Sequence, residues 1–211
     1  MSAVRGFRSA ALGLLVLALT ATAASAQWCP LGRSAETGYT LHFTNGEAFR
    51  VDKIVDDVSY VRHLDNRGNT LNSQELYKGL FTLVTFGGKG RTIYTYDVDP
   101  ATLFPLSSEG YAEVGGEMIP ENGRPSRVYR TWHIGGGSTK YLNSGEDREG
   151  LCLYNVRNVA ATTVWPDLGL EFRQEKLWSD SLNMVVYLKT TVIENGVETR
   201  VREYDVDWIT E

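Results

Sequence analysis

Long apolar runs are scarce in this 211-residue chain. The run from Ala10 to Leu19 is shorter than the roughly 20 residues that a spanning helix needs, and no second run of that kind follows. We therefore expect no stable membrane anchor. Clusters of Lys and Arg are also lacking, and the formal net charge is -5, which excludes the basic surface of a nucleic-acid-binding protein.

Residues 1–26 instead have the three parts of a secretory signal peptide. Arg5 and Arg8 precede the apolar run, and small residues up to Ala26 follow it. We predict export by the general secretory route with cleavage near Ala26, which places the mature protein in the periplasm or outside the cell. Removal of this leader would take away two arginines and no acidic residue, and would leave a more acidic protein.

Cysteine is limited to Cys29 and Cys152. Because export would place both in an oxidising compartment, we predict a disulfide between them, with unpaired buried thiols as the alternative. Cys152 stands between two leucines, a setting that does not activate a catalytic thiol. Trp28 precedes Cys29 where lipoprotein processing needs a small residue, so lipidation is not expected.

Helical periodicity is lacking as well. Beyond residue 27 the apolar residues recur in twos between Asn-Gly and Gly-Gly turns, and no segment of ten or more residues keeps the spacing of an amphipathic helix. This pattern predicts an all-β domain over residues 27–211, an antiparallel meander that forms a barrel or a sandwich. The nearest helical candidate is Ser73–Leu80, with one or two turns.

Two stretches rich in glycine and polar residues predict long loops, Pro100–Pro125 and Gly135–Gly150. The length of the chain predicts a single domain. A division into two β halves, with a boundary near residues 100–127, is the alternative.

Side-chain parity predicts the register of two Asn-Gly hairpins. In Tyr39–Val51, a three-residue loop over residues 44–46 pairs Leu41 with Phe49 and gathers the apolar side chains on one face, whereas a two-residue loop would split them. For the hairpin at residues 195–196, a simple two-residue turn predicts pairing of Val192 with Thr199.

Catalytic motifs are missing from the sequence. It contains no H-E-x-x-H or Cys-pair metal motif, no G-x-S-x-G nucleophile turn and no nucleotide-binding glycine loop. His42, His63 and His133 each fall in a strand-like segment without a second ligand at helical spacing, so we expect ordinary strand histidines. These absences favour a non-catalytic protein, and we predict no cofactor.

Paired carboxylates are the strongest chemical signal that remains. Asp97 and Asp99, like Asp205 and Asp207, stand two apart, which on a strand puts both side chains of a pair on one face. Such a pair can ligate Ca²⁺ or supply an acid and a base, and a solvated strand face is the alternative. The Tyr-Asp-Val-Asp stretch occurs twice, which either a duplicated β unit or convergence would explain.

Five tryptophans offer a second kind of site. Aromatic side chains on a β surface can stack on sugar rings or hold an apolar ligand, and core packing is the alternative. Trp165 precedes a Pro-Asp turn and is the one expected to be partly exposed. The five are Trp28, Trp132, Trp165, Trp178 and Trp208.

The sequence thus supports three hypotheses of function. The leading one is an exported, non-catalytic binding or envelope-associated module whose ligand is a small apolar molecule or a carbohydrate. A hydrolase of envelope or polysaccharide material that uses the paired carboxylates is the second. The third is a protein-partner module that uses an exposed strand edge.

Overall fold

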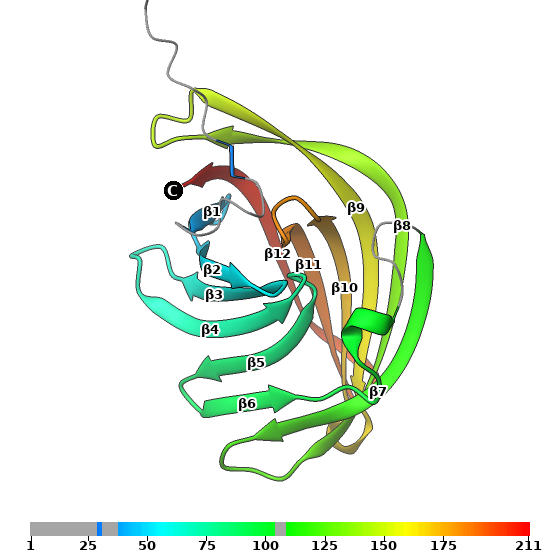
Figure 1. Ribbon diagram of the computed structural model, residues 1–211. Coiled ribbons are helices and arrows are strands. Elements are labelled where there is room, and N and C mark those ends of the chain that lie inside the picture. The colour runs from blue at the N-terminus through cyan, green and yellow to red at the C-terminus, as the bar shows by residue number, and fades with distance from the viewer. Residues whose placement is uncertain (1–28, 31–37, 104–108) are drawn as a thin grey trace, which may run out of the picture.

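The computed structural model describes residues 29–30, 38–103 and 109–211, so the predicted signal peptide lies outside the described residues. Twelve strands make up most of this part of the chain (Figure 1). They are β1 (Tyr39–Phe43), β2 (Ala48–Val55), β3 (Val58–Leu64), β4 (Thr70–Tyr77), β5 (Phe81–Gly87), β6 (Gly90–Tyr94), β7 (Gly110–Pro120), β8 (Ser126–Ser144), β9 (Gly150–Trp165), β10 (Leu170–Ser179), β11 (Met184–Glu194) and β12 (Val197–Thr210). Two 3-10 helices, η2 (Pro100–Thr102) and η3 (Pro166–Leu168), follow β6 and β9. The all-β prediction is confirmed.

The sheet closes into a barrel. Each strand pairs with its neighbours in the chain, and β1 closes the sheet by pairing antiparallel with β12, where Thr40 lies opposite Thr210. A short parallel contact between β12 and β8 adds to this seam. One continuous sheet therefore contains strands from both sides of residues 100–127. Within the described ranges, no helix has the length and apolar character needed to cross a membrane.

Both predicted long loops are wrong, and so is the short helix. The segment Pro100–Pro125 contains the whole of β7, and β8 continues through the glycines of the second predicted loop. Those glycines lie at a bulge, because the register between β8 and β9 shifts between Ile134 and Gly137. Most of Ser73–Leu80 belongs to β4, where hydrogen bonding to strands on both sides outweighs a weak helical pattern.

Glycine in β7 is explained by close packing. A methyl group on Gly116 would overlap the carbonyl oxygen of Thr95, and one on Gly115 would overlap the side chains of Arg127 and Asp97. The segment that follows β6 thus lies against the backbone of β7. Sequence reasoning treats paired glycines as a sign of a loop, but here they permit a close approach inside a strand.

Side-chain parity predicts the register of the first hairpin correctly and the register of the second incorrectly. Leu41 lies opposite Phe49 and Gly46 adopts a left-handed conformation, as the three-residue loop predicts. The β11–β12 turn has two residues as predicted, but a bulge follows it and Val192 lies opposite Arg200 instead of Thr199. That second register is wrong by one residue.

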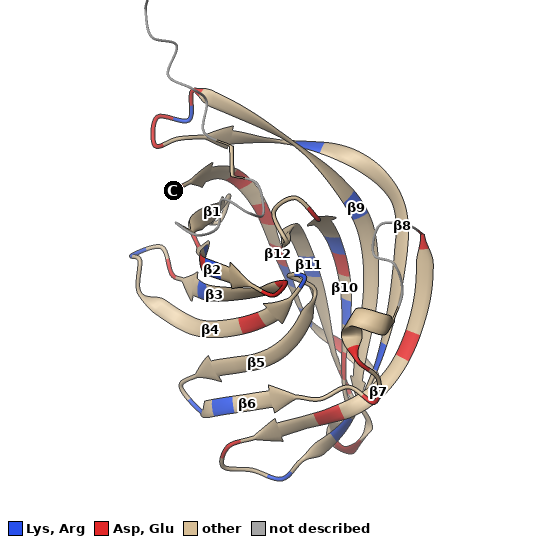
Figure 2. Ribbon diagram, in the orientation of Figure 1, with Lys and Arg blue, Asp and Glu red and all other residues tan. Residues whose placement is uncertain are grey.

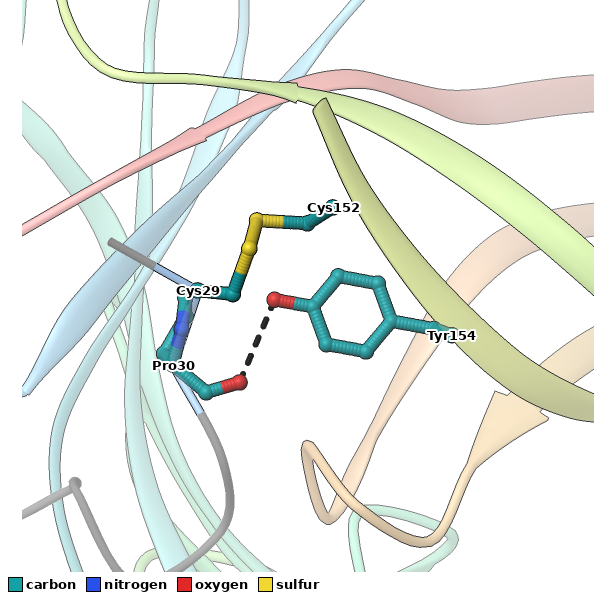
Figure 3. The surroundings of a disulfide bond; sticks show 4 residues. All are labelled: Cys29, Pro30, Cys152 and Tyr154. Atoms are coloured by element: carbon teal, nitrogen blue, oxygen red, sulfur yellow. Dashed lines mark hydrogen bonds between the residues drawn. A yellow bond between two sulfur atoms is a disulfide. The ribbon is translucent and has the colours of Figure 1, made fainter. Parts of the chain in front are cut away.

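A disulfide fastens the start of the described chain to the barrel wall. Cys29 and Cys152 are bonded, with their Cα atoms 5.6 Å apart (Figure 3). The hydroxyl of Tyr154, two residues along β9, donates a hydrogen bond of 3.1 Å to the carbonyl oxygen of Pro30. Cys152 and Tyr154 are both buried in a core cluster at this end of the barrel.

A second core cluster contains two of the tryptophans, and the prediction for Trp165 is wrong. Trp132 and Trp178 pack with Phe81 in this cluster. Trp165 is only 6% exposed, because its indole turns into the barrel and contacts the ring of Phe172, at a centroid distance of 4.9 Å.

Candidate functional site

The interior of the barrel, here called the lumen, contains a cavity of about 210 Å³. It receives side chains from β4, β5, β6, β8, β9 and β10 and from the segment after β6. The lining is a mixture of aromatic rings, uncharged polar groups and two cations: Gln74, Leu80, Thr82, Thr85, Tyr94, Tyr96, Arg130, Trp132, Thr163, Trp165, Phe172, Gln174 and Lys176. No aspartate or glutamate of the described residues lines it.

Arg130 is the more deeply buried of the two cations, with 4% of its surface exposed. Its guanidinium lies over the ring of Tyr96, 4.6 Å from the centroid, and Nη1 donates a 3.3 Å hydrogen bond to the carbonyl oxygen of Thr95. Nη2 is buried without a hydrogen-bond partner among the described residues. Burial lowers the pKa of Arg130. The guanidinium nevertheless stays protonated at physiological pH.

Lys176 is the second cation of the cavity. No described residue forms a hydrogen bond or salt bridge with its ammonium group, and its side chain is half-buried. Burial lowers the pKa of Lys176 from 10.5 to about 8. The ammonium group is therefore held in a place where its charge is not compensated by the protein.

A further unsatisfied donor belongs to a residue that lines the same cavity. The indole Nε1 of Trp165 is buried without a hydrogen-bond partner in the described part of the chain. Buried donors in folded proteins are almost always paired, so an unpaired one calls for an explanation. Arg130, Lys176 and Trp165 thus bring three polar groups with unpaired donors, two of them cationic, to the wall of one small cavity.

A second cavity, of about 330 Å³, adjoins the first along the same face of β10 and β4. Gln74, Phe172 and Gln174 line both cavities, so these three side chains form the wall that the cavities share. Gln174 is held in place because its Nε2 donates a hydrogen bond of 3.3 Å to Thr190 Oγ1. The remaining lining residues are Phe49, His63, Asn72, Leu188, Thr190, Val192, Arg200, Arg202 and Tyr204.

Cations again outnumber anions in the second cavity. Arg200 and Arg202 point into it from β12, and no described carboxylate lines it. His63 Nε2 is hydrogen-bonded to Glu47 at 2.7 Å, which orients the imidazole. Residues of both signs are spread over the strands and turns of the barrel (Figure 2), in a chain with 26 acidic and 21 basic residues. Because the chain as a whole is acidic, the excess of cations in the lining means that basic and acidic side chains are distributed unequally between the inner and outer faces of the sheet.

The predicted carboxylate pairs lie away from both cavities. Asp97 and Asp99 follow β6 outside any strand, so the prediction that they share a strand face is wrong. Asp97 forms a salt bridge with Arg127, and Asp99 accepts a 2.9 Å hydrogen bond from the backbone N–H of Ala101 at the start of η2. The carboxylate of Asp97 also interacts electrostatically with Arg130, but it forms no hydrogen bond or salt bridge with it.

The second pair does lie on a strand. Asp205 of β12 forms a salt bridge with Lys140, and Asp207 forms one of 3.2 Å with Arg148. Among the described residues, no group of three or more His, Cys, Asp or Glu side chains is placed to hold a metal ion. The Ca²⁺ site stays a prediction, which calorimetric titration of Ca²⁺ into the wild type and the Asp205→Asn variant would test.

The histidines occupy three separate places. His42 stacks on Trp208, with a centroid distance of 4.3 Å, and its Nε2 lies 3.0 Å from Thr210 Oγ1. His63 lies at the second cavity, and His133 is exposed on β8. The pKa of His42 is lowered by burial and by the nearby Arg148.

Comparisons with known proteins identify no family. No family model matches the chain, and no curated protein matches it. A solved structure that it resembles is that of the hypothetical lipoprotein YmcC from Escherichia coli (K12). The two chains are 14% identical, the alignment covers 83% of this chain and 87% of the other, and the TM-score is 0.43.

Proposed function

We propose that this protein is an exported, non-catalytic binding protein whose lumen holds a small organic anion. The ligand has a carboxylate, phosphate or sulfonate group attached to an apolar or aromatic body. The single observation that carries the proposal is the presence of Arg130 and Lys176 in one cavity that no described carboxylate lines.

The energetic argument starts from the cost of burying charge. An unpaired charge withdrawn from water costs several kcal/mol, and proteins normally avoid the cost by pairing the charge or neutralising it. Even exposed, outward-facing cations on the same strands are paired: Arg127 of β8 pairs with Asp97, and Arg173 of β10 pairs with Glu171. An anion supplied by a ligand would compensate Arg130 and Lys176 in the same way.

The rest of the cavity suits the body of such a ligand. Trp132, Trp165 and Phe172 supply aromatic surface, while Gln74 and Gln174 supply amide groups that can fix an orientation. The other hypotheses have less support. The paired aspartates line neither cavity. The sheet closes into a barrel, so the unpaired backbone edge available to a partner strand is limited to parts of strands such as Gly110–Val114 of β7.

The fluorescent anion 1-anilinonaphthalene-8-sulfonate provides a direct test. We expect it to bind the folded protein at one site, with energy transfer from Trp132 and Trp165, which line the cavity. Replacing Arg130 or Lys176 by Gln should weaken binding by about 10- to 100-fold, because a hydrogen bond to a charged group contributes about 1.5–3 kcal/mol.

Arg173→Gln is the matched control for Lys176→Gln, since both positions lie on β10 and Arg173 is exposed on the outer face. This variant should bind the dye like the wild type. Near-ultraviolet circular dichroism must show native packing in each variant, because the dye also binds partly folded states. Equal affinity of the wild type and both lumen variants would overturn the proposal.

Binding should also depend on pH. Burial lowers the pKa of Lys176 to about 8, so the ammonium group loses its proton as the pH rises from 7 to 9 and anion affinity falls. Tyr94, Tyr96 and Arg130 are the other titratable side chains of the cavity, and burial raises the pKa of Tyr96 to about 12. A bound anion would move the midpoint upward by stabilising the charged lysine.

Lys176→Arg isolates this effect, because a guanidinium stays protonated over the whole range. We expect the wild type to lose affinity between pH 7 and 9, as measured by dye titration, and the arginine variant to lose much less. A pH profile that is the same for the two proteins would show that Lys176 does not contact the anion.

A further inference from the structure

A row of inward-facing residues connects the two cavities across five strands. Arg130 of β8 lies opposite Thr163 of β9, which lies opposite Phe172 of β10. Phe172 in turn lies opposite Val192 of β11, and Val192 lies opposite Arg200 of β12. The row therefore begins and ends with an arginine. Four steps between neighbouring strands place the two Cα atoms roughly 19 Å apart along the curved wall.

The arginine at the far end has a second cation beside it. Arg202 lies two residues along β12 and points into the same cavity as Arg200. Neither guanidinium group forms a hydrogen bond or a salt bridge with another described residue, and both side chains are exposed. His63 and Asn72 lie in the facing wall of this cavity.

A β-bulge is responsible for turning these arginines inward. Glu194 lies opposite Val197, but Val192 lies opposite Arg200, so one extra residue of β12 is inserted beside Thr199. Without this insertion Val192 would face Thr199, and Val201 would point into the lumen in place of its arginine neighbours. The observed register instead leaves Val201 48% exposed on the outside.

The same register places Tyr204 and Val206 of β12 in a core cluster, where they are 9% and 3% exposed. Without the bulge, Val201 would turn inward but Tyr204 and Val206 would turn outward together with the two arginines, because these four residues share one parity along β12. Arg200 and Arg202 reach the inner face through the same bulge that buries these two side chains. The bulge thus concentrates positive charge in the lumen.

We infer that the lumen binds an elongated ligand with two anionic groups, one at Arg130 and Lys176 and the other at Arg200 and Arg202. This inference rests on the proposed function and specifies its ligand class. The middle of the ligand lies along the wall shared by the cavities, where Phe172 offers an apolar surface and Gln74 and Gln174 offer amides.

Competition with the bound dye tests the inference. We would measure displacement of 1-anilinonaphthalene-8-sulfonate by dodecanedioate, which has a carboxylate at each end, and by dodecanoate, which has one. The wild type should bind the diacid about tenfold more tightly than the monoacid, because only the diacid engages both ends of the row. The double variant Arg200→Gln/Arg202→Gln should lose this preference and keep its affinity for the monoacid.

Arg173→Gln again serves as the control and should keep the preference of the wild type. Both substituted arginines are exposed, so the double variant is expected to fold, and thermal unfolding would verify this. Equal affinity for the two acids in the wild type, or a preference that survives in the double variant, would overturn the inference while dye binding at Arg130 left the proposed function standing. Failure of the dye and both acids to bind would overturn both.

Discussion

Loss of the Cys29–Cys152 disulfide should lower the free energy of unfolding by roughly 3–5 kcal/mol. The bridge joins residues 123 positions apart, and a cross-link over so long a loop removes much of the conformational freedom of the unfolded chain. Cys152 is fully buried in a core cluster, so the cross-link ends in a well-packed part of the barrel. The Tyr154 hydrogen bond to Pro30 and the packing of residue 29 against the core cluster would remain.

Urea unfolding of the wild type with and without reductant would measure this effect. We expect the midpoint to fall when the bridge is reduced, and the dependence on urea to steepen because the unfolded chain becomes more expanded. The Cys29→Ala/Cys152→Ala variant is the control, since reductant should not change its midpoint. An oxidised protein no more stable than this variant would refute a structural role for the bridge.

Replacing Lys176 by Met should stabilise the ligand-free protein by about 2–3 kcal/mol. Burial lowers the pKa of Lys176 from 10.5 to about 8, and a tenfold change in an acid dissociation constant corresponds to about 1.4 kcal/mol, which here disfavours the charged form in the folded state. Part of the side chain remains accessible to solvent, which keeps the expected gain below the full value. In a protein of this size, the gain corresponds to a rise of roughly 4–10 °C in Tm.

The direction in which stability changes with pH follows from the lowered pKa of Lys176. Between pH 8 and 10.5 the unfolded chain holds more protons than the folded one, so the stability of the wild type should rise with pH through this window. The methionine variant should lack this rise, and the difference between the two proteins should shrink above pH 8. A methionine variant that is less stable than the wild type at pH 7 would show that the lysine is compensated in the folded protein. Gain of stability with loss of anion binding is the pattern expected of a functional residue.

Much of the fold could be predicted from alternation and turn chemistry. The register at Leu41 and Phe49 followed from parity alone, because only one loop length gathers the apolar side chains on one face. The wrongly predicted long loops both came from glycine-rich segments. Gly116 allows backbone contact within a strand, and the glycines at 135–137 allow a bulge, yet both patterns resemble loops when partner strands are unknown.

The candidate site was only partly visible in the sequence. Arg130 stands between Val128 and Trp132 at the parity of buried residues, and that placement could have marked it as inward-facing. Lys176 shares the parity of Phe172, which is a similar signal. Parity predicts the wrong face for Arg200, because the bulge at Thr199 reverses the pattern, and a bulge depends on packing across several strands.

The seam between β1 and β12 has a consequence for the order of folding. The first and last strands of the barrel pair at residues 40 and 210, so the sheet cannot close until the whole intervening chain is available. Contacts of such long sequence separation slow folding, since their entropic cost is met before they contribute. Until that moment two strand edges lie open, and an incomplete chain would be most prone to aggregate through them. Pairing of β1 with β12 is thus the step that covers these edges and protects a growing or refolding molecule from aggregation.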